Sequence, residues 1–307
     1  MKGPFTVRDN SRLFYAECTA FPSPAAVKLC LSPHTGQADP DSAHQQYDAL
    51  LRVSRALGDG CEFSVPRPYL VRADIGLVAT EWIAGPGMTD LLLSWRCGTT
   101  QAQDLMARAG RWLRVFHQAH ALAPGRLDVE HKLPFVAEME STAAASEPLF
   151  RRALSSLRQS AEPAAMVTLN RSWIHGDFKS DNLIVAGPRT VGIDIQLRRE
   201  NAVVYDLAPF LNHLELSLCH PAGWRLARSQ ALLRKTFLSA YHPVPEDAVG
   251  LPLAWVQLYL LLQGWQAALA GSWLRSTFAN LCYRRVARRL VSRIARYQAT
   301  GLPSCAA

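Results

Sequence analysis

The chain has 307 residues, of which 49% are hydrophobic and 19% charged, and its net charge is +8. This length and balance allow a sizeable buried core, which excludes a disordered chain and suits one large domain or two lobes. Residues 1–10 lack the apolar core of a signal peptide, and the seven cysteines form no Cys-x-x-Cys pair. We therefore expect a globular protein of the reducing cytoplasm.

The N-terminal third predicts strands and one helix. Strand patterns occupy residues 5–7, 13–15 and 25–31, and the last of them is interrupted by a single lysine, Lys28. Ser42 with Gln45 forms a capping-box pattern, which predicts a helix from Ser42 to about Leu57. Residues 69–73 and 77–80 then flank Asp74-Ile75-Gly76, which is typical of a hairpin.

From about residue 83 the patterns are mainly helical. The run Ala84-Gly85-Pro86-Gly87 breaks the chain after a strand, and residues 103–123 and 135–160 follow with helical spacing. Short strands are expected at 172–174 and 183–185. These signals predict an α+β fold with a β-rich N-terminal lobe, residues 1–82, and a larger, mainly helical lobe, residues 83–307.

Residues 248–274 contain no charged side chain, which raises the question of a membrane span. Gln257, Gln263 and Gln266 would be costly in lipid, and Pro252 limits the segment. We therefore expect a buried helix of the larger lobe.

The most informative stretch is His175-Gly176-Asp177-Phe178-Lys179-Ser180-Asp181-Asn182, followed by Asp194. An Asp, an Asn five residues later and a second Asp twelve residues beyond that match the order in which kinase-type enzymes place a catalytic carboxylate and their magnesium ligands. On this reading Asp177 orients the acceptor hydroxyl, and the hard oxygens of Asn182 and Asp194 bind Mg²⁺. His175 braces the loop. The pattern predicts phosphoryl transfer.

At these residues the chain resembles the aminoglycoside phosphotransferase and choline kinase group of the protein-kinase-like superfamily. The resemblance implies a two-lobed kinase-like fold, ATP and Mg²⁺ as cofactors, and Asp177 as the catalytic Asp. It further implies that Lys28, in Ala26-Val27-Lys28-Leu29, contacts the nucleotide phosphates. The backbone of Glu81, Trp82 and Ile83 would form the hinge that meets adenine. Asp206, twelve residues past Asp194, would support the catalytic loop or serve only as a helix cap.

Two positions depart from the family pattern. The family pairs its nucleotide-binding lysine with a helix Glu, whereas the aligned position here holds Gln46. The N-terminal strands also have no glycine between Pro4 and Gly36, so no Gly-rich phosphate loop is expected. Lys179 resembles the protein-kinase loop, and its ammonium either neutralises charge on the transferring phosphate or is solvated.

Three functions remain open from the sequence. The first is a kinase acting on a hydroxyl of a small molecule or saccharide. The second is a pseudokinase that serves as a binding or scaffold module, which Gln46 and the missing glycine loop favour. The third is a protein kinase, supported only by Lys179 and opposed by the lack of an Ala-Pro-Glu signature after Asp194. The oligomeric state is left open.

The basic excess is almost wholly C-terminal, because residues 248–307 carry seven Arg and no acidic residue. A helix over residues 283–297 would carry most of these arginines on one face, which is either solvated or meets a phosphorylated substrate or an anionic membrane surface. Nucleic acid ranks lowest among these partners, since no known motif accompanies the stripe. The scarcity of acids also predicts a neutral or anionic acceptor, since polycationic aminoglycosides need carboxylates around them.

Overall fold

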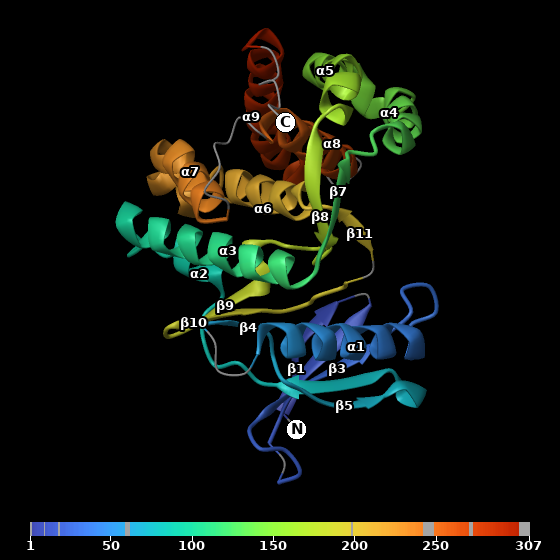
Figure 1. Ribbon diagram of the computed structural model, residues 1–307, viewed down its shortest axis with the longest axis vertical. Coiled ribbons are helices and arrows are strands. Elements are labelled where there is room, and N and C mark those ends of the chain that lie inside the picture. Colours follow the sequence, from blue (N-terminus) through green and yellow to red (C-terminus); the bar gives the residue numbers. More distant parts are fainter. Residues whose placement is uncertain are drawn as a thin grey trace.

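The computed structural model describes residues 2–8, 10–17, 19–58, 62–197, 199–241, 249–269 and 273–300. The chain forms a β-rich N-terminal part and a larger helical part stacked along the long axis of the molecule (Figure 1). Its strands are β1 (Lys2–Arg8), β2 (Ser11–Ala16), β3 (Ala25–Cys30), β4 (Phe63–Ser64), β5 (Pro68–Arg72), β6 (Leu77–Glu81), β7 (Ala121–Arg126), β8 (Thr168–Trp173), β9 (Leu183–Ala186), β10 (Arg189–Gly192) and β11 (Glu200–Ala202). Its α-helices are α1 (Pro40–Leu57), α2 (Met88–Leu93), α3 (Thr99–Ala119), α4 (Leu133–Glu140), α5 (Pro148–Ala165), α6 (Val204–Ser217), α7 (Gln230–Tyr241), α8 (Gly250–Leu269) and α9 (Trp273–Thr300). The predicted α+β, kinase-like fold is confirmed.

The N-terminal sheet is antiparallel, with strand order β1-β2-β3-β6-β5. Lys28 lies on the central strand β3, opposite Leu13 of β2 and Val78 of β6. The sheet side chains of Ala25 and Val27 are buried, and because side chains alternate across a strand, Lys28 points to the opposite face. Lys28, the lysine that interrupts an apolar strand, therefore lies at the middle of the sheet, on the face opposite Ala25 and Val27.

Helix α1 packs along this sheet (Figure 1) and begins earlier than the capping-box pattern predicts. The N-cap is Asp39, whose carboxylate accepts hydrogen bonds from the backbone and the hydroxyl of Ser42 at 3.0 and 2.7 Å. Ser42 as the N-cap was therefore wrong, because Pro40 fits the first helical turn and Asp39 supplies the stronger acceptor. The hairpin is confirmed: a short 3-10 turn and Gly76, with φ 65°, connect β5 to β6.

The helix predicted over residues 103–123 is too long at its C-terminal end. Helix α3 ends at Ala119, and the next residues form β7, which pairs with β8 in the three-stranded sheet β11-β8-β7. Pro124 cannot continue a helix. The hydrogen-bond partners of β7 come from β8, which lies far along the chain and leaves no local pattern in the sequence. Likewise, residues 135–160 are two helices, α4 and α5, since Pro148 begins the second.

The charge-free segment forms the buried helix α8, as expected, and it packs against α5, α6 and α9. No helix among the described residues combines the length and apolar character needed to cross a membrane. The basic segment lies within α9, the long red helix at the far end of the molecule from the N-terminal sheet (Figure 1).

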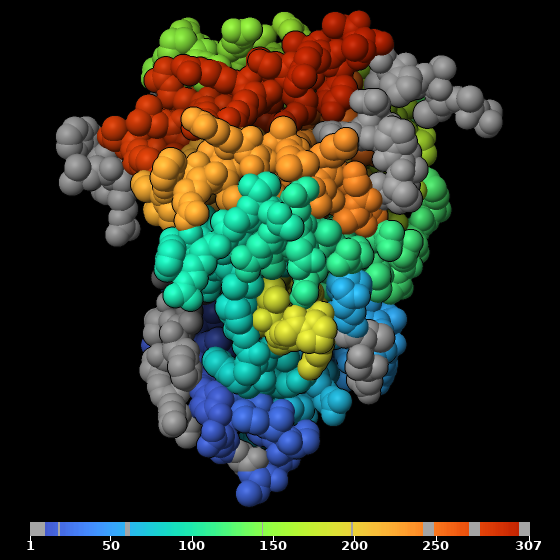
Figure 2. Space-filling model, turned by 90° about the vertical axis from the view of Figure 1, so that its left-hand side faces the viewer, coloured from blue at the N-terminus to red at the C-terminus, as the bar shows by residue number. Residues whose placement is uncertain are grey.

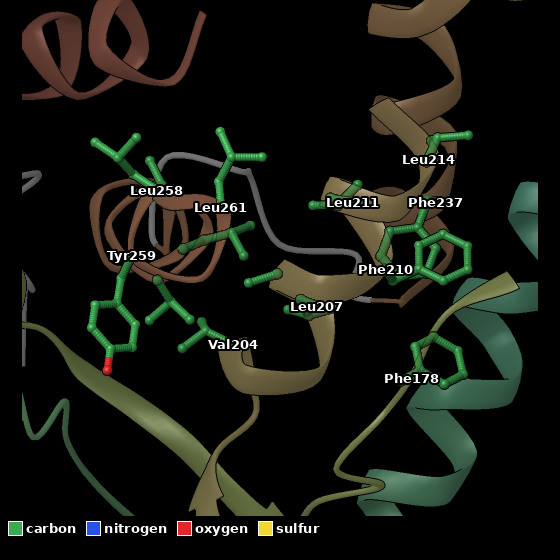
Figure 3. Packing of buried hydrophobic residues seen from close by; sticks show 14 of the residues in the cluster. Phe178, Val204, Leu207, Phe210, Leu211, Leu214, Phe237, Leu258, Tyr259 and Leu261 are labelled. Carbon is green, nitrogen blue, oxygen red and sulfur yellow. The ribbon is translucent and has the colours of Figure 1, made fainter. Parts of the chain in front are cut away.

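The largest hydrophobic core lies in the helical lobe, and it holds the catalytic stretch in place. Figure 3 shows Phe178 beside Phe210 of α6 and Phe237 of α7. The ring of Phe178 stacks on Trp112 of α3 at 5.6 Å and on Phe210 at 5.2 Å, and Phe210 stacks on Phe237 at 4.2 Å. Burying an aromatic ring of this size stabilises a fold by about 1.5–3 kcal/mol. Phe178 therefore anchors the segment around Asp177 to the core of the helical lobe.

Candidate active site

The stretch from His175 to Asn182 crosses from the end of β8 to a 3-10 turn before β9. One carboxylate oxygen of Asp177, Oδ2, accepts from Lys179 Nζ at 2.8 Å and from Asn182 Nδ2 at 3.1 Å. The Asn182 amide also donates to the Asp177 backbone carbonyl at 2.8 Å. Within the described residues Oδ1 of Asp177 accepts no hydrogen bond, so it remains available to a hydroxyl group. The Asp177 side chain is 33% exposed.

His175 lies beneath this loop and is fully buried. Its ring meets Trp112, Phe116 and Phe178 at centroid distances of 5.6–6.1 Å, and its Nδ1 accepts from the backbone amide of Asp177 at 3.3 Å. Burial lowers the pKa of His175 despite the nearby carboxylates of Asp206 and Asp177, so the ring is neutral at pH 7. The geometry gives His175 a bracing position, away from solvent.

Asp206 holds the start of the catalytic loop from below. It is fully buried, and its carboxylate accepts from the backbone amides of His175 at 2.6 Å and Gly176 at 3.0 Å. His117 of α3 contacts the same carboxylate at 3.0 Å, and its other ring nitrogen meets the Tyr241 hydroxyl at 2.9 Å. Burial alone would raise the pKa of Asp206, but the hydrogen bonds and charge of the His117 side chain hold it below the usual value.

Of the two roles that the sequence leaves open for Asp206, the contacts show loop support. The first residues of α6 thus carry a carboxylate that fixes two backbone amides 30 residues earlier in the chain. No local sequence pattern marks His117 as a partner of Asp206 or Tyr241 as a partner of His117. These residues meet because α3 and α7 pack together.

Lys28 and Asp194 meet although 166 residues separate them. Lys28 Nζ lies 2.7 Å from Asp194 Oδ1, with both side chains about one-quarter exposed. Asp194 adopts φ 61°, a left-handed conformation that is strained for a residue with a side chain and that occurs most often at functional sites. Gln46 of α1 lines the same cavity as Lys28 and accepts from the Cys30 thiol at 3.8 Å.

A cavity of about 500 Å³ lies between the two lobes, and it gathers most of the predicted site residues. Its lining includes Lys28, Gln46, Glu81, Trp82, Ile83, Asn182 and Asp194. The backbone amide of Trp82 donates to the Pro24 carbonyl at 2.8 Å, so its hydrogen bond is already made within the protein. Figure 2 shows the yellow β9–β10 hairpin at the surface between the teal α2–α3 region and the blue N-terminal lobe.

The Gly-Pro-Gly linker after the hinge closes one side of this cavity. Val185 donates to the carbonyl of Pro86 at 3.0 Å, so the linker runs along β9. A side chain at Gly85 would stand 2.6 Å from the Val185 carbonyl oxygen, which is too close. The glycine at position 85 is therefore required by the close approach of two backbones.

One histidine beside the loop was not singled out from the sequence. His213 of α6 lies 3.0 Å from the Ser180 hydroxyl and 3.2 Å from the Asp181 carboxylate. The hydrogen bond from His213 lowers the pKa of Asp181 to about 2, although partial burial opposes the shift. Thr89 of α2 meets the Ser180 hydroxyl from the other side at 2.7 Å. The short turn before β9 is thus tied to both α2 and α6.

Comparisons with known proteins agree with this geometry. Residues 20–249 match the APH phosphotransferase enzyme family. A choline/ethanolamine kinase family protein from Mesorhizobium loti is similar in structure, with a TM-score of 0.63 at 16% identity over 95% of this chain and 90% of that one. Amicoumacin kinase, in complex with AMP-PNP and Ca²⁺, gives 0.58 at 12% identity over 98% and 89%. A glucosamine kinase gives 0.54 at 17% identity over 91% and 74%.

No curated protein sequence matches the chain. The family match nevertheless spans both lobes, since it starts before Lys28 and ends beyond Asp206. It therefore covers residues 175–182, the Lys28–Asp194 pair and residues 81–83 together. On this match and on the kinase-like fold, the chain belongs to the APH phosphotransferase enzyme family, and it is a phosphotransferase with an alcohol group as acceptor.

Proposed function

We propose that this protein transfers the γ-phosphoryl group of ATP, with Mg²⁺, to a hydroxyl group of a neutral or anionic small molecule or saccharide. The observation that carries the proposal is that Lys28, Asn182 and Asp194 line one interlobe cavity, with Asp177 hydrogen-bonded to Asn182 beside it. A pseudokinase has no need of this complete set. Among the described residues, Cys97 and Cys282 are free thiols, which suits the reducing cytoplasm that the sequence predicts.

The cavity residues fit ATP. One part of the lining is apolar and comes from both lobes, with Ala26 and Val78 on one side and Ile184 on the other, which suits a purine ring. The other part holds the Lys28 ammonium, which suits the phosphates. AMP-PNP in the amicoumacin kinase complex is consistent with a nucleotide in this fold. The hinge contribution of Glu81, Trp82 and Ile83 remains part of this proposal.

The donor set also fits Mg²⁺. This ion prefers hard oxygen ligands and usually binds through one or two protein side chains together with substrate phosphates. The Asn182 amide oxygen and the Asp194 carboxylate supply such ligands, and both line the cavity. Bound Mg²⁺ would neutralise charge on the phosphates. Within the described residues no group of three His, Cys, Asp or Glu is placed to hold a metal ion.

Asp177 and Lys179 act at the acceptor side of this arrangement. The unpaired Oδ1 of Asp177 can accept the hydrogen of an acceptor hydroxyl, which orients the oxygen for attack and takes up its proton. Asn182 and Lys179 hold Oδ2 and so fix the rotation of the carboxylate. The Lys179 ammonium adds positive charge where the transferring phosphate carries negative charge.

The charge pattern supports a neutral or anionic acceptor. Residues 133–165, which precede the loop, offer four acids to a cationic substrate, and two of them are already paired: Glu140 with Arg158 at 2.7 Å and Glu147 with Arg284 at 3.2 Å. In the cleft, Glu81 lies 3.7 Å from Arg189 and Asp181 pairs with His213. A polycation would therefore compete with existing partners for most of these carboxylates.

An ADP-release assay with Mg²⁺-ATP across cationic, neutral and anionic hydroxyl compounds tests the proposal. We expect turnover on a neutral or anionic compound and no useful turnover on kanamycin-like aminoglycosides. The Asp194→Ala variant, which lacks a metal ligand, serves as the inactive control and should also lose Mg²⁺-dependent nucleotide binding. Turnover restricted to aminoglycosides would contradict the acceptor class and direct attention to Asp90, a further acid of the cleft. Nucleotide binding without turnover on any compound would favour the pseudokinase.

The Gln46→Glu variant tests the missing ion pair of the nucleotide site. A carboxylate at position 46 would give Lys28 a second partner beside Asp194, and part-exposed pairs of this kind contribute about 0–1 kcal/mol. We expect kcat/KM for ATP to stay unchanged or to rise by up to about fivefold. Gln101→Glu adds the same charge at an exposed position of α3 outside this cavity and should have no effect. A large loss in Gln46→Glu would show that Gln46 does not face the lysine.

A further inference from the structure

A second cavity, of about 460 Å³, lies in the helical lobe and is lined mainly by arginines. It is bounded by α6, by the 3-10 helix Pro221–Ser229, by the start of α7 and by α9. Figure 2 shows the orange segment that includes α7 directly beneath the red α9. The charged residues of its lining are Glu215, Arg228, Arg234, Arg288, Arg289, Arg293 and Arg296.

Glu215, the one acid among the described lining residues, is already shared by two arginines. Glu215 is 1% exposed, and its Oε1 lies 3.9 Å from Arg234 Nη1 and 3.7 Å from Arg293 Nη1. Arg234 is itself buried and donates to the Gln257 side chain at 2.9 Å, which holds it at the base of the cavity. The floor of the cavity therefore carries charges of both signs, whereas its remaining arginines lie around it.

Within the described residues, the other four arginines of the lining have no acidic partner. Arg228, Arg288, Arg289 and Arg296 form no ion pair with any carboxylate in the described part of the chain, and Arg289 donates only to the neutral Gln230 side chain. Like charges that converge on a concave surface repel one another, and low-dielectric walls strengthen their field. Four guanidinium groups gathered in this way favour the binding of an anion.

This cavity is separate from the nucleotide cleft. None of its lining residues lines the interlobe cavity. Helix α6 lies between the two, because His213 contacts the catalytic loop whereas Glu215, two residues later and on another face of the helix, lines the arginine cavity.

We propose that this arginine cavity is a binding site for a small polyanion with two or more phosphate or sulfate groups. Guanidinium groups bind such oxyanions through paired hydrogen bonds, and a volume of this size suits a small molecule. Arg228, Arg288 and Arg296 are exposed at the rim of the cavity, whereas Arg234 and Arg293 lie recessed at 5% and 15% exposure. The guanidinium groups thus surround a depression instead of lying in one outward plane, which suits a small anion better than a flat membrane surface. The proposal does not rest on the kinase assignment.

Calorimetry with inorganic pyrophosphate, without metal, tests the site. All proteins carry Lys28→Ala, so that the nucleotide cleft lacks its phosphate-binding ammonium. The test variant adds Arg288→Gln and Arg296→Gln, both exposed positions at which folding should be preserved. The charge-matched control instead adds Arg285→Gln and Arg151→Gln, which are exposed and lie outside the cavity.

We expect one pyrophosphate per chain, an affinity at least about tenfold weaker in the Arg288/Arg296 variant, and a change of no more than about twofold in the control. Absence of pyrophosphate binding, or equal affinities in the two variants, would overturn the proposal. Cosedimentation with phosphatidylserine vesicles is measured in parallel. Vesicle binding without pyrophosphate binding would also overturn it, in favour of a membrane-facing basic helix.

Discussion

Asp177→Asn should lower the turnover number by about 10²–10⁴-fold, the usual contribution of a positioned acid–base group. The substitution keeps the shape of the side chain, and the amide oxygen can still accept from Asn182, so the loop should keep its conformation. It removes the negative charge that would take the proton of the acceptor hydroxyl. The turnover number and the KM for ATP are measured by ADP release, with an active acceptor from the compound screen.

The KM for ATP should change little, because Lys28, Asn182 and Asp194 are untouched. Asp48→Asn makes the same change on the exposed face of α1, where Asp48 is 57% exposed, and should leave turnover unchanged. Thermal unfolding confirms that both variants are folded. Turnover within about threefold of the unmodified enzyme in Asp177→Asn would rule out the assigned role.

Asp206→Asn should lower the free energy of unfolding by about 3–5 kcal/mol, because it removes a buried carboxylate and leaves its hydrogen-bond donors without a charged acceptor. The Asp206 carboxylate accepts from two backbone amides and contacts His117, all within the buried core. The amide of an asparagine has only one oxygen to accept from these groups. Its NH₂ group would face the backbone N–H groups, which are donors as well. Urea unfolding measures the change. The exposed Asp104→Asn, which loses a surface pair with Arg108, should cost about 0–1 kcal/mol.

The stability difference between the unmodified protein and Asp206→Asn should depend on pH. The folded-state pKa of Asp206 lies below its ordinary value of 3.8, so its contribution is present above about pH 3.8 and is lost as the pH falls toward the folded-state pKa. The difference should therefore narrow as the pH falls below about 4. A difference that grows on acidification would show that the carboxylate is protonated in the folded protein.

The sequence alone predicted the parts of the protein that depend on local order. Asp177, Asn182 and Asp194 lie within one continuous segment, residues 177–194. Their order and spacing can therefore be recognised in the sequence without knowledge of the fold. Lys28 was recognisable for a related reason: a charged residue is costly inside an apolar strand unless it has a task there. The hairpin around Gly76 and the buried helix α8 likewise follow from turn chemistry and from continuous apolar character.

Only the tertiary structure decided which distant residues meet. Residues 121–123 were expected in a helix and became strand β7, since β8 offered hydrogen-bond partners that no local pattern records. His117 and Tyr241 join Asp206 because α3 packs on α7. The arginine stripe of α9 looked like a single solvated or docking face, whereas α6, α7 and the 3-10 helix before α7 fold against it and bring Arg228, Arg234 and Glu215 to the same cavity. Helical periodicity states which side chains share a face, but the partner of that face depends on how elements far apart in the chain pack together.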